Sequence, residues 1–194
     1  MWVGVAEELG HPLTPDRDAL LHRFHDWLLT EALAAGGIGP RETDRIQDRH
    51  IADSLIYAKF FAVPPILWDL GSGVGLPGIP LAIMFPETEH VLIDRSGRRV
   101  NLMKRAIRVL GLDNVTVRQE EIARLQGPVP VVVSRASLPP EQLRTHLERF
   151  LEPGGVAVIG GSWVAPPVHD GWITEEVVLR SLDRRVWLLI MRRQ

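Results

Sequence analysis

A run of glycines between residues 69 and 78 is the segment best suited to chemistry. It follows a short apolar stretch and reads Asp69-Leu70-Gly71-Ser72-Gly73-Val74-Gly75-Leu76-Pro77-Gly78. Glycine lets the backbone turn sharply and approach a ligand closely. The helix predicted to follow would offer unpaired N–H groups at its N-terminus. The segment therefore predicts a ligand-binding turn between a strand and a helix, and its last three glycines have the spacing of a dinucleotide fingerprint.

An acidic residue ends each of the first two predicted strands. Asp94 lies 19 residues after Gly75, where a carboxylate binds the ribose of a nucleotide cofactor. This spacing fits both a nicotinamide dinucleotide and S-adenosylmethionine. Asp69 favours the second, because a carboxylate beside the turn would repel a pyrophosphate and would tolerate a sulfonium and an ammonium. We expect S-adenosylmethionine; a dinucleotide, or a turn without a ligand, is the alternative.

Strands and helices alternate from residue 66 onward, which predicts a parallel sheet built from right-handed crossovers. The apolar run Val131-Val132-Val133 fits a strand covered on both faces. A closing hairpin, at 173–179 and 186–191, is typical of methyltransferases. The expected strands are 66–70, 89–94, 115–118, 129–134 and 156–159, and the expected helices are 79–85, 97–110 and 138–151.

The first third of the chain is predicted to be helical. Thr14 or Asp16 can cap a helix whose apolar residues recur at helical spacing as far as Leu33. A second helix is predicted from about residue 45 to residue 61, before Pro64-Pro65. We expect an N-terminal helical cap, residues 1–64, on a cofactor-binding core, residues 65–194.

Composition excludes several kinds of site. The chain has no cysteine, which excludes disulfides, thiolate metal sites and a cysteine nucleophile. With 24 acidic and 22 basic residues, any nucleic-acid partner must be met by a local basic patch. No apolar run approaches the length of a membrane span, and the N-terminus does not have the pattern of a signal peptide. We expect a monomeric cytoplasmic protein without a metal.

Three residues of the second predicted helix, His50, Asp53 and Ser54, share one helix face. They could line the entrance of the pocket, or Asp53 and Ser54 could hold the helix against the glycine turn. One histidine and one carboxylate lack the further ligands that a metal needs. Arg135 ends an apolar strand beside the predicted pocket, where an arginine needs a partner. The candidate catalytic residues are Arg135, His50 and Asp53.

Basic residues concentrate between residues 95 and 118, where seven accompany a single acidic residue, Asp113. They could bind RNA phosphates, or they could form an ordinary solvated helix face. Trp163, in a loop rich in glycine and proline, could stack on a splayed base or pin that loop to the sheet. The candidate substrate-binding residues are Arg98, Arg99, Arg105 and Arg108.

Four segments together resemble one family, the bacterial 16S ribosomal RNA guanine-N7 methyltransferases called glucose-inhibited division protein B. The resemblance covers about residues 45–160. The four segments are Arg49-His50-Ile51-Ala52-Asp53-Ser54-Leu55, Asp69 to Pro80 with its Leu-Pro-Gly-Ile-Pro ending, Leu92 to Val100, and Val133-Ser134-Arg135-Ala136.

The resemblance implies a class I S-adenosylmethionine-dependent methyltransferase, with a Rossmann-like, mostly parallel, seven-stranded sheet and a helical cap. It implies methyl transfer to guanine N7 of small-subunit rRNA, which is a partner as free RNA or as the assembled subunit. It also implies that Asp94 binds the ribose, that Ile122 and Ala123 lie near the adenine, and that Arg135 faces the pocket. The implied cofactor-binding residues are Asp69, Gly71, Gly73, Gly75, Leu76, Asp94, Ile122, Ala123 and Arg135.

Two departures from the family pattern leave alternatives open. Residues 36–43 lack the family's Asn-Leu-Thr segment, and Gly160-Gly161 stands where the family has Lys-Gly. Because a lysine there could contact a phosphate or base, its loss affects the substrate more than the cofactor. A different RNA, a small-molecule substrate, or a non-catalytic RNA-binding role therefore remains an alternative.

Overall fold

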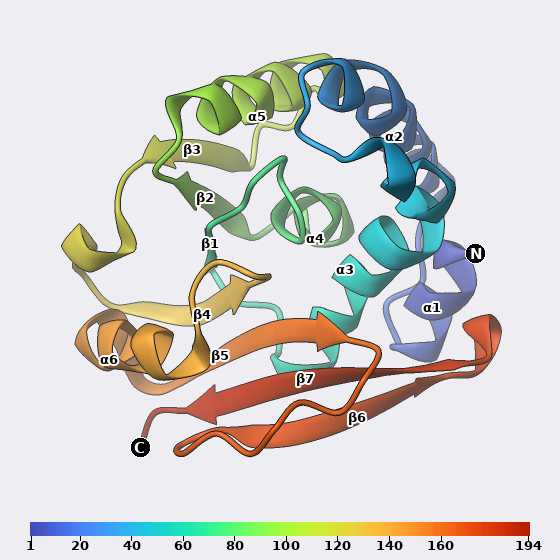
Figure 1. The fold of residues 1–194 in the computed structure, drawn as a ribbon. Helices are drawn as coiled ribbons and strands as arrows, with labels where there is room; N and C mark the ends of the chain where they lie inside the picture. Colours follow the sequence, from blue (N-terminus) through green and yellow to red (C-terminus); the bar gives the residue numbers. More distant parts are fainter.

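The computed structural model describes residues 1–194, arranged around one seven-stranded sheet (Figure 1). The strand order is β3-β2-β1-β4-β5-β7-β6. The first five strands in chain order are parallel, and β7 and β6 complete the sheet as an antiparallel hairpin. The strands are β1 (Ile66–Leu70), β2 (Glu89–Asp94), β3 (Val115–Gln119), β4 (Val129–Ser134), β5 (Leu151–Ser162), β6 (Ile173–Leu179) and β7 (Arg184–Arg192).

The helices fill the N-terminal third and the crossovers between strands. The α-helices are α1 (Trp2–Glu8), α2 (Pro15–Trp27), α3 (Asp53–Leu55), α4 (Gly78–Met84), α5 (Gly97–Leu110) and α6 (Pro140–Phe150). Two π-helical segments, η1 (Leu28–Ala32) and η3 (Ile46–Ala52), and four 3₁₀ turns, η2 (Pro40–Arg45), η4 (Ile56–Phe60), η5 (Ile122–Arg124) and η6 (Arg180–Leu182), complete the set.

The order in which the chain adds strands to the sheet reverses between β1 and β4. β1 pairs with β2 on one side and with β4 on the other, so the chain builds the sheet outward both ways from this point. The loops that leave the two strands diverge here, and ligands of open α/β sheets bind in the crevice that results. The loop after β1 carries the glycine run, so the topology places the predicted turn at this crevice.

The two faces of the sheet are buried by different helices. Side chains of Leu67, Leu92 and Val131 point to the face covered by α1 to α5, where they join one large hydrophobic cluster. Their strand neighbours Trp68 and Val132 point to the other face, where α6 packs (Figure 1). This alternation follows from the two-residue period of a strand, and both faces of the sheet are buried, as the apolar strand pattern predicted.

Most sequence-predicted elements are present, and the fold class is confirmed. The strands at 66–70, 89–94, 129–134 and 173–179 and the helix at 97–110 have the predicted bounds. Thr14 caps α2, since its Oγ1 accepts a hydrogen bond from the N–H of Arg17 at 3.3 Å. The predicted second helix is wrong in kind, because 46–60 divides into π-helical, α-helical and 3₁₀ pieces. The helix at 2–8 was not predicted, and β5 starts five residues earlier than expected, at Leu151.

The helices of residues 1–64 do not form a core of their own. Buried side chains of α1, α2 and η3 belong to the same hydrophobic cluster as strand residues Leu67 and Val158. The division into a cap and a core at residue 64 stays a prediction. None of the helices is both long and apolar enough to cross a bilayer.

Candidate functional site

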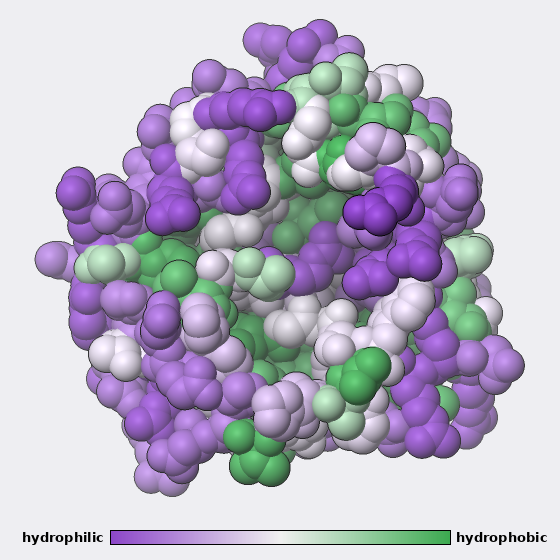
Figure 2. All heavy atoms as spheres, viewed as in Figure 1, coloured by the Kyte–Doolittle hydropathy of each residue, from purple (hydrophilic) through white to green (hydrophobic).

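A cavity of about 290 Å³ opens at the carboxyl ends of β1, β2 and β3. Small-molecule sites begin at roughly 300 Å³, so the space suits one nucleoside-sized ligand. Figure 2 shows a hollow at the middle of this face of the molecule, with hydrophilic side chains around it. The lining residues include Gly71, Asp94, Glu120, Ile122, Ala123, Ser137 and Leu138.

The glycine turn forms one wall of the cavity, and its backbone explains the residue type. Gly71 has φ +69°, and a Cβ at this position would collide with Ser137, in the loop after β4. Glycine alone fits such a close approach at a positive φ. The turn after β1 and the loop after β4 therefore meet at Gly71, and together they close this side of the cavity.

Asp69 lies beneath the turn, fully buried, rather than in the cavity wall. Its Oδ2 accepts a hydrogen bond of 2.9 Å from the N–H of Gly78, the first residue of α4. Its Oδ1 has no partner. Burial raises the pKa of the Asp69 carboxyl to about 7, against the Gly78 hydrogen bond and the Arg135 charge, which lower it. Asp69 thus fixes the start of α4, and its free oxygen lies below the turn where a cationic group would stabilise its charge.

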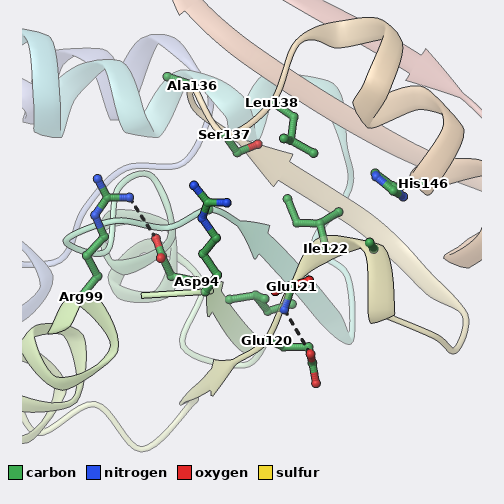
Figure 3. Close-up of a pocket in the computed structure, with 13 residues that line it drawn as sticks. Asp94, Arg99, Glu120, Glu121, Ile122, Ala136, Ser137, Leu138 and His146 are labelled. Atoms are coloured by element: carbon green, nitrogen blue, oxygen red, sulfur yellow. Dashed lines mark hydrogen bonds and ion pairs between the residues drawn. The ribbon is translucent and has the colours of Figure 1, made fainter. Parts of the chain in front are cut away.

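Asp94 ends β2 and lies at the cavity, as the sequence predicted (Figure 3). Its Oδ2 accepts the N–H of Gly73 at 3.1 Å, and its Oδ1 accepts the N–H of Ser96 at 2.8 Å. The exposed guanidinium of Arg99 is 3.5 Å from Oδ2. A carboxylate has about four acceptor positions, so one remains for a ligand, and a second is freed if Arg99 swings into solvent.

The opposite end of the cavity is less polar. Ile122 and Ala123 lie on the turn η5 after β3, and Leu138 faces them from the loop after β4 (Figure 3). His146 of α6 closes this end. Apolar side chains on two sides of a slot suit a flat aromatic ring. The residue types thus fit an adenosine, with acceptors at the ribose end and apolar contacts at the base end.

The other residues of the glycine turn do not all reach the cavity. Gly73 contributes its N–H to Asp94, as described above, and Gly75 has φ +96° where the chain turns toward α4. A Cβ at Gly75 would collide with Ile79. Leu76 is buried in the large hydrophobic cluster and does not line the cavity. Gly73, Gly75 and Leu76 therefore shape the turn, and any contact of theirs with a cofactor stays a prediction.

A second group of polar residues lies outside the cavity lining, where η3 and α3 meet the end of β5 and the start of β7. Asp53, which is 3% exposed, accepts hydrogen bonds from Arg184 and from the indole N–H of Trp163, the latter at 3.0 Å. Arg184 also binds Asp48 at 3.1 Å. Burial raises the pKa of Asp53 to about 6, and the Arg184 charge opposes this. Asp53 therefore ties the helical segment to the hairpin edge of the sheet, instead of to the glycine turn.

Trp163 pins its loop, which is one of the two roles that its sequence context allowed. Besides the bond to Asp53, its ring lies 4.9 Å from the guanidinium carbons of both Arg49 and Arg184. Trp163 is still 40% exposed. Ser54, by contrast, is fully buried and donates its hydroxyl to the carbonyl of His50, so it does not line an entrance.

His50 and Arg135 contact each other. An Nη of Arg135 lies 3.3 Å from Nδ1 of His50, and the other Nη donates to the carbonyl of Arg49 at 3.3 Å. Nε2 of His50 lies 3.2 Å from Oε2 of Glu42. Burial and the Arg135 charge lower the pKa of His50 to about 4. The structure thus joins two of the three candidate catalytic residues and supplies the partner that Arg135 needs.

The four candidate RNA-binding arginines all lie exposed on α5. Arg99 pairs with Asp94, and Arg105 pairs with Glu31 of η1 at 2.8 Å. Arg98 and Arg108 form no ion pair. The N-terminus of α5 adjoins the cavity, and the helix extends away from it along the surface (Figure 1), so the positive stripe starts at the cavity mouth.

The chain matches the family model described as GidB, rRNA small subunit methyltransferase G, over residues 17–164. Among curated proteins it is 39% identical over 165 residues to the ribosomal RNA small subunit methyltransferase G of Acidothermus cellulolyticus, covering 84% of this chain and 74% of that protein. The protein of the same name from Chlorobaculum tepidum is 35% identical over 184 residues, covering 93% and 81%.

The chain belongs to the GidB family. Solved structures agree in fold: a SAM-dependent methyltransferase from Aquifex aeolicus aligns with a TM-score of 0.56 at 17% identity, covering 80% of this chain and 98% of that one. A putative rRNA-methylase from Clostridium thermocellum aligns with a TM-score of 0.54 at 15% identity, covering 76% and 97%. Membership in the GidB family confirms the expected methyltransferase class and S-adenosylmethionine as its cofactor.

The sequence reasoning missed three residues of this site. Glu42, Arg184 and His146 belong to no motif that the sequence analysis singled out. Arg184 meets Asp53 across 131 residues of chain, and Glu42 meets His50 only because η2 folds back on η3. One signal was present: a buried aspartate such as Asp53 needs a cation, and this requirement could have prompted a search for one.

Proposed function

We propose that this protein transfers a methyl group from S-adenosylmethionine to N7 of a guanine in small-subunit ribosomal RNA. The observation that carries the proposal is the cavity at the switch point of the sheet, with Asp94 at one end and Ile122 at the other, in a chain of the GidB family. Asp94 would hold the ribose, and Ile122 and Ala123 the adenine. The bound cofactor supplies an electrophilic methyl group on a sulfonium.

The chain's own residues suit an acceptor that carries no proton. Guanine N7 has a lone pair, so the reaction needs alignment and exclusion of water rather than a general base. Asp53 is paired with Arg184, and His50 is held between Glu42 and Arg135, so neither is free to remove a proton. Arg135 retains three of its five N–H groups after its two contacts. We infer that these donors contact the guanine or a neighbouring phosphate.

The RNA would lie along α5. Arg98 and Arg108 are exposed and without ion pairs, and Arg99 and Arg105 are exposed with one carboxylate each. Such side chains neutralise RNA phosphates at little cost, because few internal contacts must break. A ribosomal substrate supports the expected cytoplasmic location, and the monomeric state stays a prediction.

The test is methyl transfer from labelled S-adenosylmethionine to small ribosomal subunits, and separately to free 16S rRNA, from cells that lack this modification. We expect label at one guanine, with strand scission at that base after chemistry specific for 7-methylguanine. Gly73→Trp should abolish transfer, because Gly73 has φ +63°, which a tryptophan adopts only with strain, and the change distorts the turn whose N–H binds Asp94. Label at another atom would show that guanine N7 is not the methyl acceptor. Transfer to small molecules alone would show that ribosomal RNA is not the substrate. Cofactor binding without transfer to any RNA would indicate a non-catalytic relative.

A further inference from the structure

Three groups at the edge of the site form a chain of contacts that joins η2, η3 and the end of β4. Glu42 lies on η2, His50 on η3, and Arg135 directly after β4. The distances along the chain are 3.2 Å from Glu42 Oε2 to His50 Nε2 and 3.3 Å from His50 Nδ1 to Arg135. The side chains of Glu42 and His50 are 32% and 16% exposed, so solvent reaches Glu42 more than His50.

The chemistry of these partners fixes the proton on His50. A guanidinium can only donate hydrogen bonds, so Nδ1 of His50 must accept and carries no proton. A carboxylate can only accept, so Nε2 must carry the proton and donate it to Glu42. His50 is therefore a neutral imidazole with one defined tautomer. The depressed pKa of His50, about 4, agrees with this assignment at neutral pH.

Glu42 reinforces the tautomer that Arg135 requires, because its carboxylate accepts the proton on Nε2. Without a carboxylate at Nε2, only Arg135 favours this tautomer, and the Nδ1–H form becomes accessible when the ring turns away from the guanidinium. The Nε2–H tautomer instead gives Arg135 an acceptor on one side, while the Arg49 carbonyl gives it an acceptor on the other. Two acceptors from one helical segment hold a planar guanidinium in a fixed orientation.

Arg135 lies where orientation matters. The next two residues along the chain, Ala136 and Ser137, line the cavity, and Ser137 is the residue that a side chain at Gly71 would strike. Gly161 leaves room beside Arg135, since a Cβ there would lie 4.0 Å from its Cδ. The backbone of Arg135 thus adjoins the cavity, while its guanidinium lies against η3, outside the cavity lining, and is held in orientation by the two contacts there.

We propose that Glu42 is a positioning residue of this site, which acts through the Nε2–H tautomer of His50 to orient Arg135 toward the RNA substrate. This inference rests on the proposed function for its substrate. His50 is a positioning residue in the same chain rather than an acid or a base. The carboxylate of Glu42 lies within the segment 36–43, where this chain departs from the family pattern.

The first test reads the tautomer without any activity measurement. Nitrogen NMR of protein labelled in its histidines should show, for His50, a protonated Nε2 and an unprotonated Nδ1 near pH 7, with the signal assigned by its loss in His50→Asn. In Glu42→Ala the ring loses its contact at Nε2, so the two nitrogens should shift toward averaged values to the extent that the ring turns away from Arg135. A protonated Nδ1, or a charged ring, in the native protein would overturn the proposal.

The second test separates positioning from a structural role. Glu42→Ala and His50→Ala should each lower kcat/KM for the RNA about tenfold, the scale of a small loss of orientation, and leave the dissociation constant for S-adenosylmethionine unchanged. His50→Asn places an amide oxygen, which can accept from Arg135, where Nδ1 was, so it should recover most of the loss. Asp44→Ala, on the same turn as Glu42, is the control and should have no effect.

The outcomes remain distinguishable. Equal activity of Glu42→Ala and the native chain, or no recovery in His50→Asn, would refute positioning while leaving the methyltransferase proposal intact. If the native chain transfers no methyl group to any RNA, the proposed function fails and the positioning role toward RNA fails with it. The NMR result then still decides whether the Glu42–His50–Arg135 contacts exist.

Discussion

The cavity and the polar cluster beside it are built from the same sheet edge, yet their polar groups are used in opposite ways. In the cavity, Asp94 keeps an acceptor position open, and Asp69 beneath it has an oxygen without a partner. In the cluster, Asp53 and Arg184 are bonded to each other and to Trp163 and Asp48, and of these groups only the Nε of Arg184 has no partner. Unpaired groups beside a space indicate where a ligand supplies the missing partners. Paired groups indicate a framework that holds the segment carrying His50 in place.

The largest effect is expected when Arg184, the cation of the cluster, is removed. Arg184→Met leaves the buried Asp53 without its cation, so we expect a loss of about 3–5 kcal/mol in the free energy of unfolding, measured by urea denaturation. Arg185→Met, one residue along β7, removes only an exposed pair with Glu176 and should cost less than about 1 kcal/mol. Equal costs for the two variants would show that the cluster is not a framework.

A smaller effect is expected in the cavity wall, and it falls on binding. Gly71→Ala must accommodate both a positive φ and a collision with Ser137, so we expect S-adenosylmethionine to bind at least about tenfold more weakly by calorimetry. The matched control is Gly111→Ala. Gly111 has nearly the same φ, +70°, but nothing lies within 4 Å of its added Cβ. If Gly71→Ala and Gly111→Ala bind S-adenosylmethionine with equal affinity, the close approach at Gly71 does not contribute to cofactor binding.

The buried carboxyl beneath the turn predicts a dependence on pH. Burial raises the pKa of Asp69 from 3.8 to about 7, so the folded state binds its proton more tightly than the unfolded state does. The contribution of Asp69 to stability is therefore greatest below pH 4 and is lost as the pH rises toward 7, by at most about 1.4 kcal/mol per pH unit.

Asp69→Asn keeps an acceptor for the Gly78 N–H and removes the titration. The stability of this variant relative to the native chain should increase from pH 4 to pH 7 and then level off, as followed by chemical denaturation at each pH. A stability difference that does not change between pH 4 and pH 7 would mean that folding does not raise the pKa of Asp69. The carboxylate would then be charged in the folded protein over this range.

The smallest expected effect concerns the RNA surface. Arg108→Ala removes an exposed, unpaired cation from α5, so the dependence of log affinity on log salt for small-subunit RNA should become shallower by about 1. Binding of S-adenosylmethionine should not change. Arg144→Ala on α6, on the other face of the sheet, is the control. An equal change in slope for both variants would mean that α5 is not the RNA footprint.

Much of the cavity could be predicted from the sequence because its residues are local. Gly71 and Asp69 belong to one run, and Asp94 ends the next strand, so their meeting follows from the rule that parallel strands end at one edge. The strand bounds at β1, β2 and β4 were correct for a related reason, since apolar runs bounded by glycine, proline and acidic residues leave few alternatives.

The cluster could not be predicted in the same way. Its contacts join η3, α3, the end of β5 and the start of β7, and no local pattern relates Asp53 to Arg184. The π-helical winding of η3 was also missed, because it inserts a residue into the helical repeat. The assumption of regular spacing put His50, Asp53 and Ser54 on one face. In the structure His50 meets Arg135, Asp53 meets Arg184, and Ser54 bonds back to His50.

The most direct test is a crystal structure of the protein with S-adenosylhomocysteine, the product form of the expected cofactor. The account predicts its ribose hydroxyls on the carboxylate of Asp94, its adenine between Ile122 and Leu138, and its sulfur beside the turn at Gly71. Density for the ligand elsewhere, or side chains of the protein filling this cavity in the complex, would contradict it.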